Sequence, residues 1–379
     1  MGRFFIPRET RLGETRVAAS PETVKKLVSF GCSVLIENDS GNKSGFLNKD
    51  YLEAGANLID VSNDDLSNVN VVLCVNKPDQ NILSKLSRGT LVIGLLEPYG
   101  NKDLSDLFQN KGFSAISMEL LPRISRAQSS DALSSQANIA GYKSVLIAAS
   151  ELDRYFPMLM TAAGTVQPAK VVILGAGVAG LQAIATAKRL GAVVFVSDIR
   201  PIVKEQVESL GGKFIDPPDI SEEPKESGGY AKQVSPEFLK AQREELIKHL
   251  SEADVAICTA QVPGKRAPLL IDEDMLKNMR QGSVVVDLAV SQGGNCFGSV
   301  EDKTVIVNGI KLIGASKLPQ SVSNHASSLY SRNLLALIDP MITKGELLLN
   351  TEDELIKGCL LFKDGVVQLP EVLSTGVKI

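Results

Sequence analysis

Short apolar runs alternate with amphipathic stretches along the first third of the chain. Three of the runs have the length and apolar continuity of buried strands: SVLIEN (33–38), VVLCVN (71–76) and TLVIGLL (90–96). Amphipathic segments predict helices near residues 21–30, 50–55 and 101–110. This alternation predicts a parallel sheet covered by helices.

A second alternation begins at residue 170. Its predicted strands are KVVILG, AVVFVSD, DVAICTA, SVVVDLA and VIVNGIKLIGAS, five strands that fill one doubly wound domain. Before it, residues 134–150 (SSQANIAGYKSVLIAAS) predict a helix that bridges two domains. After it come a predicted helix, ASSLYSRNLLALI, and a predicted hairpin at Lys363-Asp364-Gly365. We expect this tail to fold back on the first domain.

A length of 379 residues is too great for one ordinary core and suits two domains. We therefore predict an α/β fold with two Rossmann-like, doubly wound parallel-sheet domains and a cleft between them. The first domain would comprise residues 1–133 and be completed by the tail, 320–379. The second would comprise residues 134–319.

The composition narrows the class of partner. A net charge of −4 argues against a broad nucleic-acid-binding face, which needs clustered Lys and Arg, so we expect a small-molecule or protein partner. The 5 cysteines form no CxxC pair, which indicates neither a disulfide framework nor a metal site and fits a reducing interior. The N-terminus, MGRFFIPRET, lacks the apolar core of a signal peptide.

The segment KVVILGAGVAG (170–180) places a GxGxxG turn between a predicted strand and a predicted helix. In this pattern Gly175 permits the tight turn, Gly177 lets the backbone approach a pyrophosphate, and Gly180 lets the helix pack on the strand. The N-terminus of the helix offers free N–H groups and the positive end of its dipole to the phosphates.

The next predicted strand ends in Asp198, 18 residues beyond Gly180, where a carboxylate would bind a ribose 2′-hydroxyl and repel a 2′-phosphate. This favours NAD(H) over NADP(H), although Arg200 could accommodate the phosphate. Two further segments follow strands, TAQVPGKRAP (259–268) and VVVDLAVSQGGN (284–295), and either could line the nucleotide or be a plain connection. The candidate cofactor-binding residues are Gly175, Ala176, Gly177, Val178, Ala179, Gly180, Asp198, Ile199, Arg200, Gln261 and Leu288.

Two other segments stand out. Residues 216–238 are rich in Pro, Gly and acidic residues and have no apolar periodicity, so they form a functional lid, a disordered insert or a plain solvated loop; Tyr230 lies within them. RISRAQSSDALSSQ (123–136) gathers Arg123, Arg126, Gln128, Asp131 and Ser134 near a helix start. An N-cap at Ser130 or Asp131 accounts for part of this segment, but not for its arginines and glutamines beside the domain junction.

Together these segments resemble the NAD(H)-binding component (domain I, alpha subunit) of proton-translocating NAD(P) transhydrogenase, in the alanine dehydrogenase/transhydrogenase superfamily. The resemblance covers nearly the whole chain. It is carried by ETRVAASPETVKKL, RISRAQSSDALSSQANIAGYK, ILGAGVAGLQAIATAKRLGA, GGYAK, PGKRAP and VVVDLAVSQGGNC.

The resemblance implies roles for the matching positions. Arg123, Gln128, Asp131 and Ser134 would lie around the nicotinamide, and Gln128 would hold it for transfer. Tyr230 would lie on a mobile loop that closes over bound NAD(H). Hydride would pass directly from NADH to NADP⁺ on a partner domain, coupled to proton movement through a membrane-spanning subunit. A homodimer at the inner, cytoplasmic face of the membrane is implied.

No side chain needs to act as acid or base in such a transfer, because the hydride chemistry belongs to the cofactors. The main alternative is a soluble NAD-dependent alanine dehydrogenase. Neither His249 nor His325 lies where those enzymes place a catalytic histidine, and Ser291 replaces an acid of their pattern. Two positions match their substrate-binding pattern and are interpreted as structural or vestigial: Arg16 and Lys77. An NAD-sensing binding module is a third hypothesis.

Overall fold

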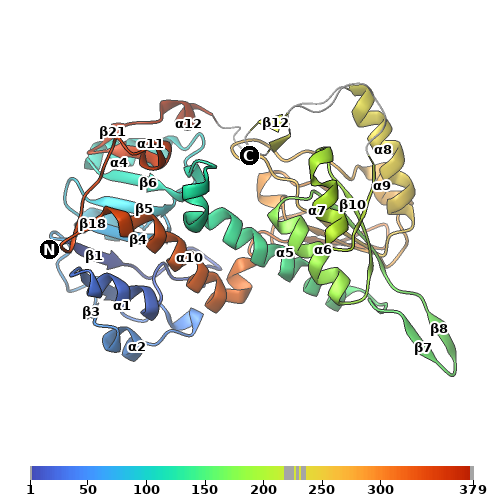
Figure 1. Cartoon of the computed structure of the whole chain (residues 1–379), viewed down its shortest axis with the longest axis horizontal. Coiled ribbons are helices and arrows are strands. Elements are labelled where there is room, and N and C mark those ends of the chain that lie inside the picture. Colours follow the sequence, from blue (N-terminus) through green and yellow to red (C-terminus); the bar gives the residue numbers. More distant parts are fainter. Residues whose placement is uncertain (1, 217–225, 228–229, 232–235, 376–379) are drawn as a thin grey trace. The chain divides into compact units, whose positions relative to one another are not determined.

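The structure, a computed structural model, describes residues 2–216, 226–227, 230–231 and 236–375. It divides into two compact units (Figure 1), Met1–Gln136 with Pro319–Lys378, and Ala137–Leu318. Each unit is built around one sheet in which parallel pairs dominate, flanked by helices. The predicted α/β class with two Rossmann-like sheets is confirmed.

The first unit contains an 8-stranded sheet of order β21-β20-β6-β5-β4-β1-β2-β3. Its strands are β1 (Arg3–Ile6), β2 (Ser33–Glu37), β3 (Asn57–Ile59), β4 (Val71–Asn76), β5 (Leu91–Leu95), β6 (Ser114–Ser117), β20 (Leu360–Lys363) and β21 (Val366–Val367). Strands β1 to β6 pair in parallel, whereas β20 and β21 add an antiparallel edge beside β6. The C-terminal segment thus extends the sheet formed by the N-terminal residues.

The predicted hairpin in this tail is confirmed. Asp364 (φ 51°) and Gly365 (φ 83°) connect β20 to β21 as a two-residue turn. Positive φ at both residues is the backbone of the turn that matches strand twist, and it favours Gly at the second position.

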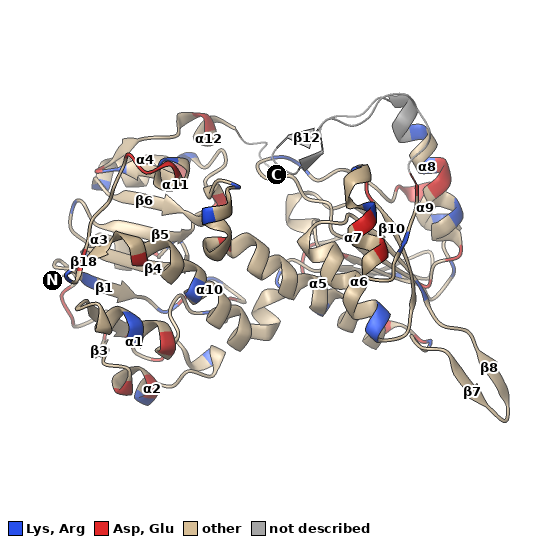
Figure 2. Cartoon of the chain, viewed as in Figure 1, with Lys and Arg blue, Asp and Glu red and all other residues tan. Residues whose placement is uncertain are grey.

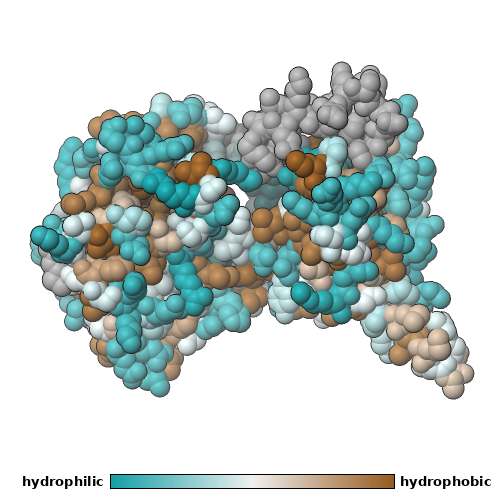
Figure 3. Space-filling model, viewed as in Figure 1, coloured by the Kyte–Doolittle hydropathy of each residue, from teal (hydrophilic) through white to brown (hydrophobic). Residues whose placement is uncertain are grey.

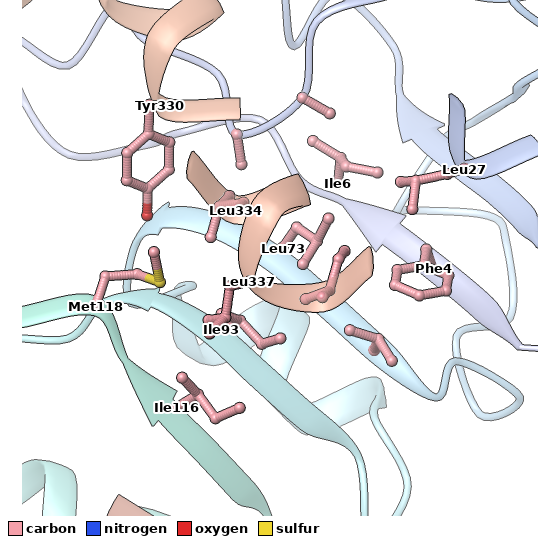
Figure 4. Packing of buried hydrophobic residues seen from close by; sticks show 14 of the residues in the cluster. Phe4, Ile6, Leu27, Leu73, Ile93, Ile116, Met118, Tyr330, Leu334 and Leu337 are labelled. Carbon is pink, nitrogen blue, oxygen red and sulfur yellow. The ribbon is translucent and has the colours of Figure 1, made fainter. Parts of the chain in front are cut away.

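The helices of the first unit are α1 (Pro21–Ser29), α2 (Asn48–Glu53), α3 (Gln80–Lys85), α4 (Lys102–Lys111), α10 (Ser323–Ile338), α11 (Glu354–Cys359) and α12 (Pro370–Ser374). Four of them confirm predicted helices: α1, α2, α4 and α10. Figure 4 shows how α10 covers the sheet, with Leu334 and Leu337 packed over Leu73 and Ile93 of β4 and β5. Burial of such side chains contributes about 1.5–3 kcal/mol each, so α10 is an integral part of this core.

The second unit contains a 7-stranded sheet of order β11-β10-β9-β14-β15-β17-β16. Its strands are β9 (Lys170–Leu174), β10 (Val193–Ser197), β11 (Lys213–Phe214), β14 (Val255–Cys258), β15 (Val284–Asp287), β16 (Thr304–Val307) and β17 (Ile310–Gly314). Its helices are α5 (Ala132–Glu151), which begins in the first unit, α6 (Val178–Arg189), α7 (Lys204–Ser209), α8 (Pro236–Ser251) and α9 (Glu273–Asn278).

One predicted strand of this unit was wrong. The run VIVNGIKLIGAS forms two antiparallel strands, β16 and β17, because Asn308 (φ 51°) and Gly309 (φ 76°) turn the chain. Asn-Gly is the strongest short hairpin signal, and it outweighed the apolar continuity of the run. The predicted five strands are therefore seven, with β11 the other addition.

The strand order reverses between β9 and β14, since the chain runs from β9 outward to β10 and returns to β14 on the other side. Ligands of doubly wound sheets bind at the carboxyl ends of the strands beside such a reversal. The predicted helix at 134–150 is confirmed as α5. Of the predicted lid, 216–238, the structure describes little beyond β12 (Glu226–Ser227) and β13 (Tyr230–Ala231). Among the described residues, no helix has both the length and the apolar character needed to cross a bilayer.

A buried ion pair stabilises the first unit. Arg16 Nη2 lies 2.7 Å from Glu14 Oε2, and Arg16 Nη1 donates to Gln136 Oε1 at 3.0 Å. The two side chains are 6% and 2% exposed. Burial alone would raise the pKa of Glu14, but the hydrogen bonds and charge of Arg16 outweigh it and lower the pKa to about 2. These contacts give Arg16 a structural role.

The lowered pKa of Glu14 predicts acid lability. Because the folded state binds the ionised carboxylate better than the unfolded state does, this contribution is complete above pH 4.5 and is lost as the pH falls toward about 2. The expected loss is about 3 kcal/mol of unfolding free energy. Urea unfolding between pH 2 and 7 should show it in the wild type, whereas Glu14→Gln should start lower and change less. Parallel pH profiles for the two proteins would contradict the assignment.

Candidate functional site

The glycine turn joins β9 to α6 at the carboxyl edge of the second sheet. Gly175 has φ +103°, a backbone conformation that favours glycine. A Cβ atom on Gly180 would lie 1.9 Å from the Gly175 carbonyl oxygen, so the first turn of α6 can approach β9 only with glycine at this position. A Cβ atom on Gly177, in contrast, would meet no described atom within 4 Å. Two of the glycines are thus required by packing and the third faces open space.

The N-terminus of α6 suits an anionic ligand. Gly177 is its N-cap residue and has no side chain, and within the described part of the chain no side-chain oxygen caps the first turn. The N–H groups that begin a helix need acceptors, and a phosphate supplies both acceptors and negative charge. The open space at Gly177 and the uncapped turn therefore fit the pyrophosphate of a dinucleotide.

Asp198 follows β10 and lies beside this turn. Its carboxylate accepts the Ala176 N–H at 2.7 Å and the Arg200 N–H at 2.9 Å. The Arg200 side chain donates two more hydrogen bonds, from Nε and Nη2, both at 2.9 Å. The carboxylate is therefore fixed against the glycine turn, at the end of the strand where the sequence predicts a ribose-binding acid.

The loop after β14 contacts the glycine turn. Thr259 Oγ1 lies 3.0 Å from the Gly175 carbonyl oxygen and 3.2 Å from that of Leu174, and it donates to either. In the same loop, Gln261 Nε2 donates to the Leu288 carbonyl at 2.6 Å, which joins two candidate residues from neighbouring strands. The loops after β9, β14 and β15 are therefore linked directly.

Asn295 bridges the last two of these loops. Its Oδ1 accepts the Ala260 N–H at 3.1 Å, and its Nδ2 donates to the carbonyls of Ala260 and Pro268 at 2.9 and 2.8 Å. Asn295 is fully buried, so each of its polar atoms requires such a partner. Sequence reasoning missed this residue and Thr259, because both act on segments far away along the chain.

Asp287 at the end of β15 holds the same loop from below. Its carboxylate accepts N–H groups from Ala289 at 2.9 Å, Asn295 at 2.9 Å and Cys296 at 3.0 Å. Burial raises the pKa of Asp287, and the hydrogen bonds from Cys296 and Ala289 oppose that rise. The position within VVVDLAVSQGGN was visible in the sequence, but its role as an anchor was not recognised.

The arginine- and glutamine-rich segment lies in the first unit, on η3 (Ser125–Ser130) and the start of α5. Asp131 caps α5, accepting the Ser134 N–H at 2.9 Å and the Ser134 hydroxyl at 2.6 Å. The predicted N-cap at Asp131 is confirmed. Arg123 and Gln128 are exposed, whereas Arg126 Nη1 donates to Asp353 Oδ2 at 3.0 Å.

Helix α10 fixes this segment through Asn333, which sequence reasoning also missed. Asn333 Nδ2 donates to the Ser129 carbonyl at 2.8 Å, and Asn333 Oδ1 accepts the Ser135 hydroxyl at 2.7 Å. The backbone on both sides of Asp131 is thereby held against a helix about 200 residues further along the chain. Gln128 lies on a fixed turn with an exposed side chain.

The candidate residues divide between the two units. Four lie together in the first unit: Arg123, Gln128, Asp131 and Ser134. The others lie at the carboxyl edge of the second sheet: Gly175, Ala176, Gly177, Val178, Ala179, Gly180, Asp198, Ile199, Arg200, Gln261 and Leu288. Tyr230 belongs to β13, and its side chain lies outside the described residues.

The doubly wound sheet, the glycine turn and the uncapped helix define a nucleotide-binding protein of the Rossmann-like class. Two family models match the sequence, alanine dehydrogenase/PNT N-terminal domain over residues 5–140 and alanine dehydrogenase/PNT C-terminal domain over residues 144–370. The chain belongs to the alanine dehydrogenase/PNT family.

Within this family the chain is similar to transhydrogenase alpha subunits. It is 45% identical to the first of the chains that make up NAD(P) transhydrogenase subunit alpha in Rhodospirillum rubrum, over 99% of this chain and 100% of the relative. The structure of a transhydrogenase from Sinorhizobium meliloti superposes with a TM-score of 0.88 at 43% identity, covering 96% of this chain and 99% of the other. An L-alanine dehydrogenase structure gives a TM-score of 0.79 at 26% identity, covering 98% and 99%.

Proposed function

We propose that this protein is the NAD(H)-binding component of a proton-translocating NAD(P)⁺ transhydrogenase. It would exchange hydride between NADH, held on this chain, and NADP⁺, held on a partner subunit. The observation that carries the proposal is the glycine turn with its open face at Gly177, in a chain that matches a transhydrogenase alpha subunit from end to end. The proposed partners are an NADP(H)-binding subunit and a membrane-spanning subunit, which would couple transfer to proton translocation. The complex would place this chain at the cytoplasmic face of the membrane.

The chain's own residues would bind and orient the cofactor, which when bound supplies the hydride chemistry. The N–H groups of the first turn of α6 would hold the pyrophosphate, and Asp198 would accept a hydrogen bond from the adenosine ribose. Gln128, on its fixed turn, would orient the nicotinamide together with Arg123, Asp131 and Ser134. Approach and orientation, rather than proton transfer by a side chain, are the contributions expected of the protein.

An alanine dehydrogenase is the competing function, supported by the lower similarity to that enzyme. Isothermal titration calorimetry of the isolated chain should detect NADH binding, and assays with NAD⁺ and alanine should detect no oxidation. Hydride exchange should begin only when an NADP⁺-loaded partner subunit is added. Robust alanine deamination by the isolated chain would refute the proposal.

Two conservative substitutions test the proposed nicotinamide site. Gln128→Asn should shorten the side chain that orients the ring, and Tyr230→Phe should remove the hydroxyl of the proposed closing loop. Each should slow hydride exchange with the partner several-fold, about 1 kcal/mol in the barrier, because misalignment raises the barrier directly. Thermal unfolding should be unchanged. Gln80→Asn, at an exposed glutamine of the same unit, is the matched control. Unchanged exchange rates in both variants would remove these residues from the site.

The proposed homodimer has a physical basis in an exposed hairpin of the second unit. Strands β7 (Leu159–Thr161) and β8 (Gly164–Val166) pair only with each other, among the described residues, and extend away from the rest of the unit (Figure 1). Residues 156–169 contain no charged side chain (Figure 2), and Met160 is 72% exposed. Figure 3 shows apolar surface on this arm. A two-stranded hairpin is marginally stable alone, so a second copy of the chain is the proposed support.

Removal of the hairpin should therefore convert the dimer into a monomer. The backbone bond from the Ala169 N–H to the Phe156 carbonyl, 3.1 Å, closes its base, so residues 158–167 can be replaced by a short Gly-Ser turn. Sedimentation velocity should show a dimeric wild type and a monomeric deletion variant that still binds NADH. A deletion variant that stays dimeric, or a monomeric wild type, would contradict the proposed role.

A further inference from the structure

Arg200 occupies the carboxylate that the proposed function assigns to the ribose. A carboxylate has about four lone-pair positions for hydrogen bonds. In Asp198 four donors fill them: the N–H groups of Ala176 and Arg200, and the Nε and Nη2 atoms of Arg200. The two side chains are 8% and 17% exposed, so the pair is largely shielded from water.

A ribose hydroxyl needs one of these positions, and only one of the present donors can leave. The two backbone N–H groups are fixed, one by the glycine turn and one by the chain two residues beyond Asp198. The guanidinium, in contrast, is at the end of a flexible side chain. A nucleotide that binds Asp198 through its ribose must therefore displace the guanidinium from the carboxylate.

We infer that Arg200 is a specificity-determining residue that competes with the ribose for Asp198 and thereby narrows the preference for NADH over NADPH. The inference rests on the proposed function. In the resting pair the positive guanidinium offsets the negative carboxylate, so a 2′-phosphate meets less repulsion than a lone aspartate would cause. A displaced guanidinium remains beside the ribose, where it offers a bidentate partner for that phosphate.

Two affinities should move in opposite directions when Arg200 is changed. Arg200→Gln removes the competitor, so NADH should bind about fivefold more tightly, which is the scale of a partly shielded ion pair. NADPH should bind at least about tenfold more weakly, because Asp198 would face the 2′-phosphate unneutralised. Arg200→Lys keeps the charge without the bidentate geometry and should give intermediate values for both nucleotides. Lys204→Gln is the matched control, since Lys204 is a cation of the same region that pairs with Asp216 instead.

The test is calorimetric titration of the full-length wild type and the three variants with NADH and with NADPH, alongside thermal unfolding. Opposite shifts in Arg200→Gln, with Lys204→Gln unchanged, support the inference. A parallel fall of both affinities would mean that Arg200 only supports Asp198 structurally, and unchanged affinities would mean that it takes no part; either result overturns the inference alone. If Arg200→Gln does not fold, Arg200→Lys decides by the same comparison. A wild type that binds no NADH overturns the proposed function as well.

Discussion

Gly177→Ala is expected to weaken NADH binding about a hundredfold while leaving the protein as stable as the wild type to within about 1 kcal/mol. The backbone at Gly177, φ −78° and ψ −169°, is open to alanine, and the added Cβ would meet no described atom within 4 Å. The folded protein therefore tolerates the methyl group. A bound pyrophosphate would not, because the methyl group would keep it from N–H groups whose charge-assisted hydrogen bonds contribute about 1.5–3 kcal/mol each.

Gly180→Ala is the matched comparison, three residues further along the same turn. Its Cβ would lie 1.9 Å from the Gly175 carbonyl oxygen, so this variant should lose stability as well as binding. Calorimetric titration with NADH and urea unfolding of the two variants separate the effects. A Gly177→Ala protein that binds NADH as tightly as the wild type would show that no phosphate lies against this turn.

Asp287→Ala should have the largest effect on stability, about 4 kcal/mol. The substitution leaves three N–H groups, those of Ala289, Asn295 and Cys296, without their acceptor in the interior. A buried donor left unsatisfied costs about 1–3 kcal/mol. Because the freed loop carries Asn295 and Leu288, which hold the neighbouring loop, the folded fraction should also bind NADH more weakly.

Asp254→Ala separates these two consequences. Asp254 is a buried acid at the amino end of β14, where it accepts the Lys170 N–H and an Arg154 hydrogen bond, both at 2.9 Å. Its loss should destabilise the same sheet and leave the NADH affinity of the folded protein unchanged. Urea unfolding and calorimetry on both variants provide the comparison. Equal loss of affinity in both would mean that Asp287 has no particular role in holding the site.

The sequence predicted most of the fold because local patterns determine it. The run VVLCVN became β4 without any shift in bounds, and Asp364-Gly365 became the predicted turn. The exposed arm of β7 and β8 was missed because neither strand has a buried face, so no alternation of apolar and polar residues exists to be read. VIVNGIKLIGAS failed for a different reason, since its turn signal was present but was given less weight than its apolar residues.

The site was predictable only where one segment contains the whole signal. The glycine turn combines strand, turn and helix within eleven residues, 170–180, and the N-cap at Asp131 needs only Ser134 three residues later. The network that holds the loops is different in kind. Thr259 reaches back 84 residues to Gly175, and Asn295 reaches 35 residues to Ala260. Contacts of this kind arise from strand order, which places β9, β14 and β15 side by side.

The central claim is that this chain presents NADH to a nucleotide on a second protein. The most direct measurement uses NADH deuterated at the transferable position of nicotinamide C4, mixed with this protein and an NADP⁺-loaded partner subunit. The account predicts that the deuterium appears at C4 of NADPH, with none lost to water, and that no transfer occurs without the partner. NADPH that carries no label, or transfer at the same rate in the absence of this chain, would contradict it.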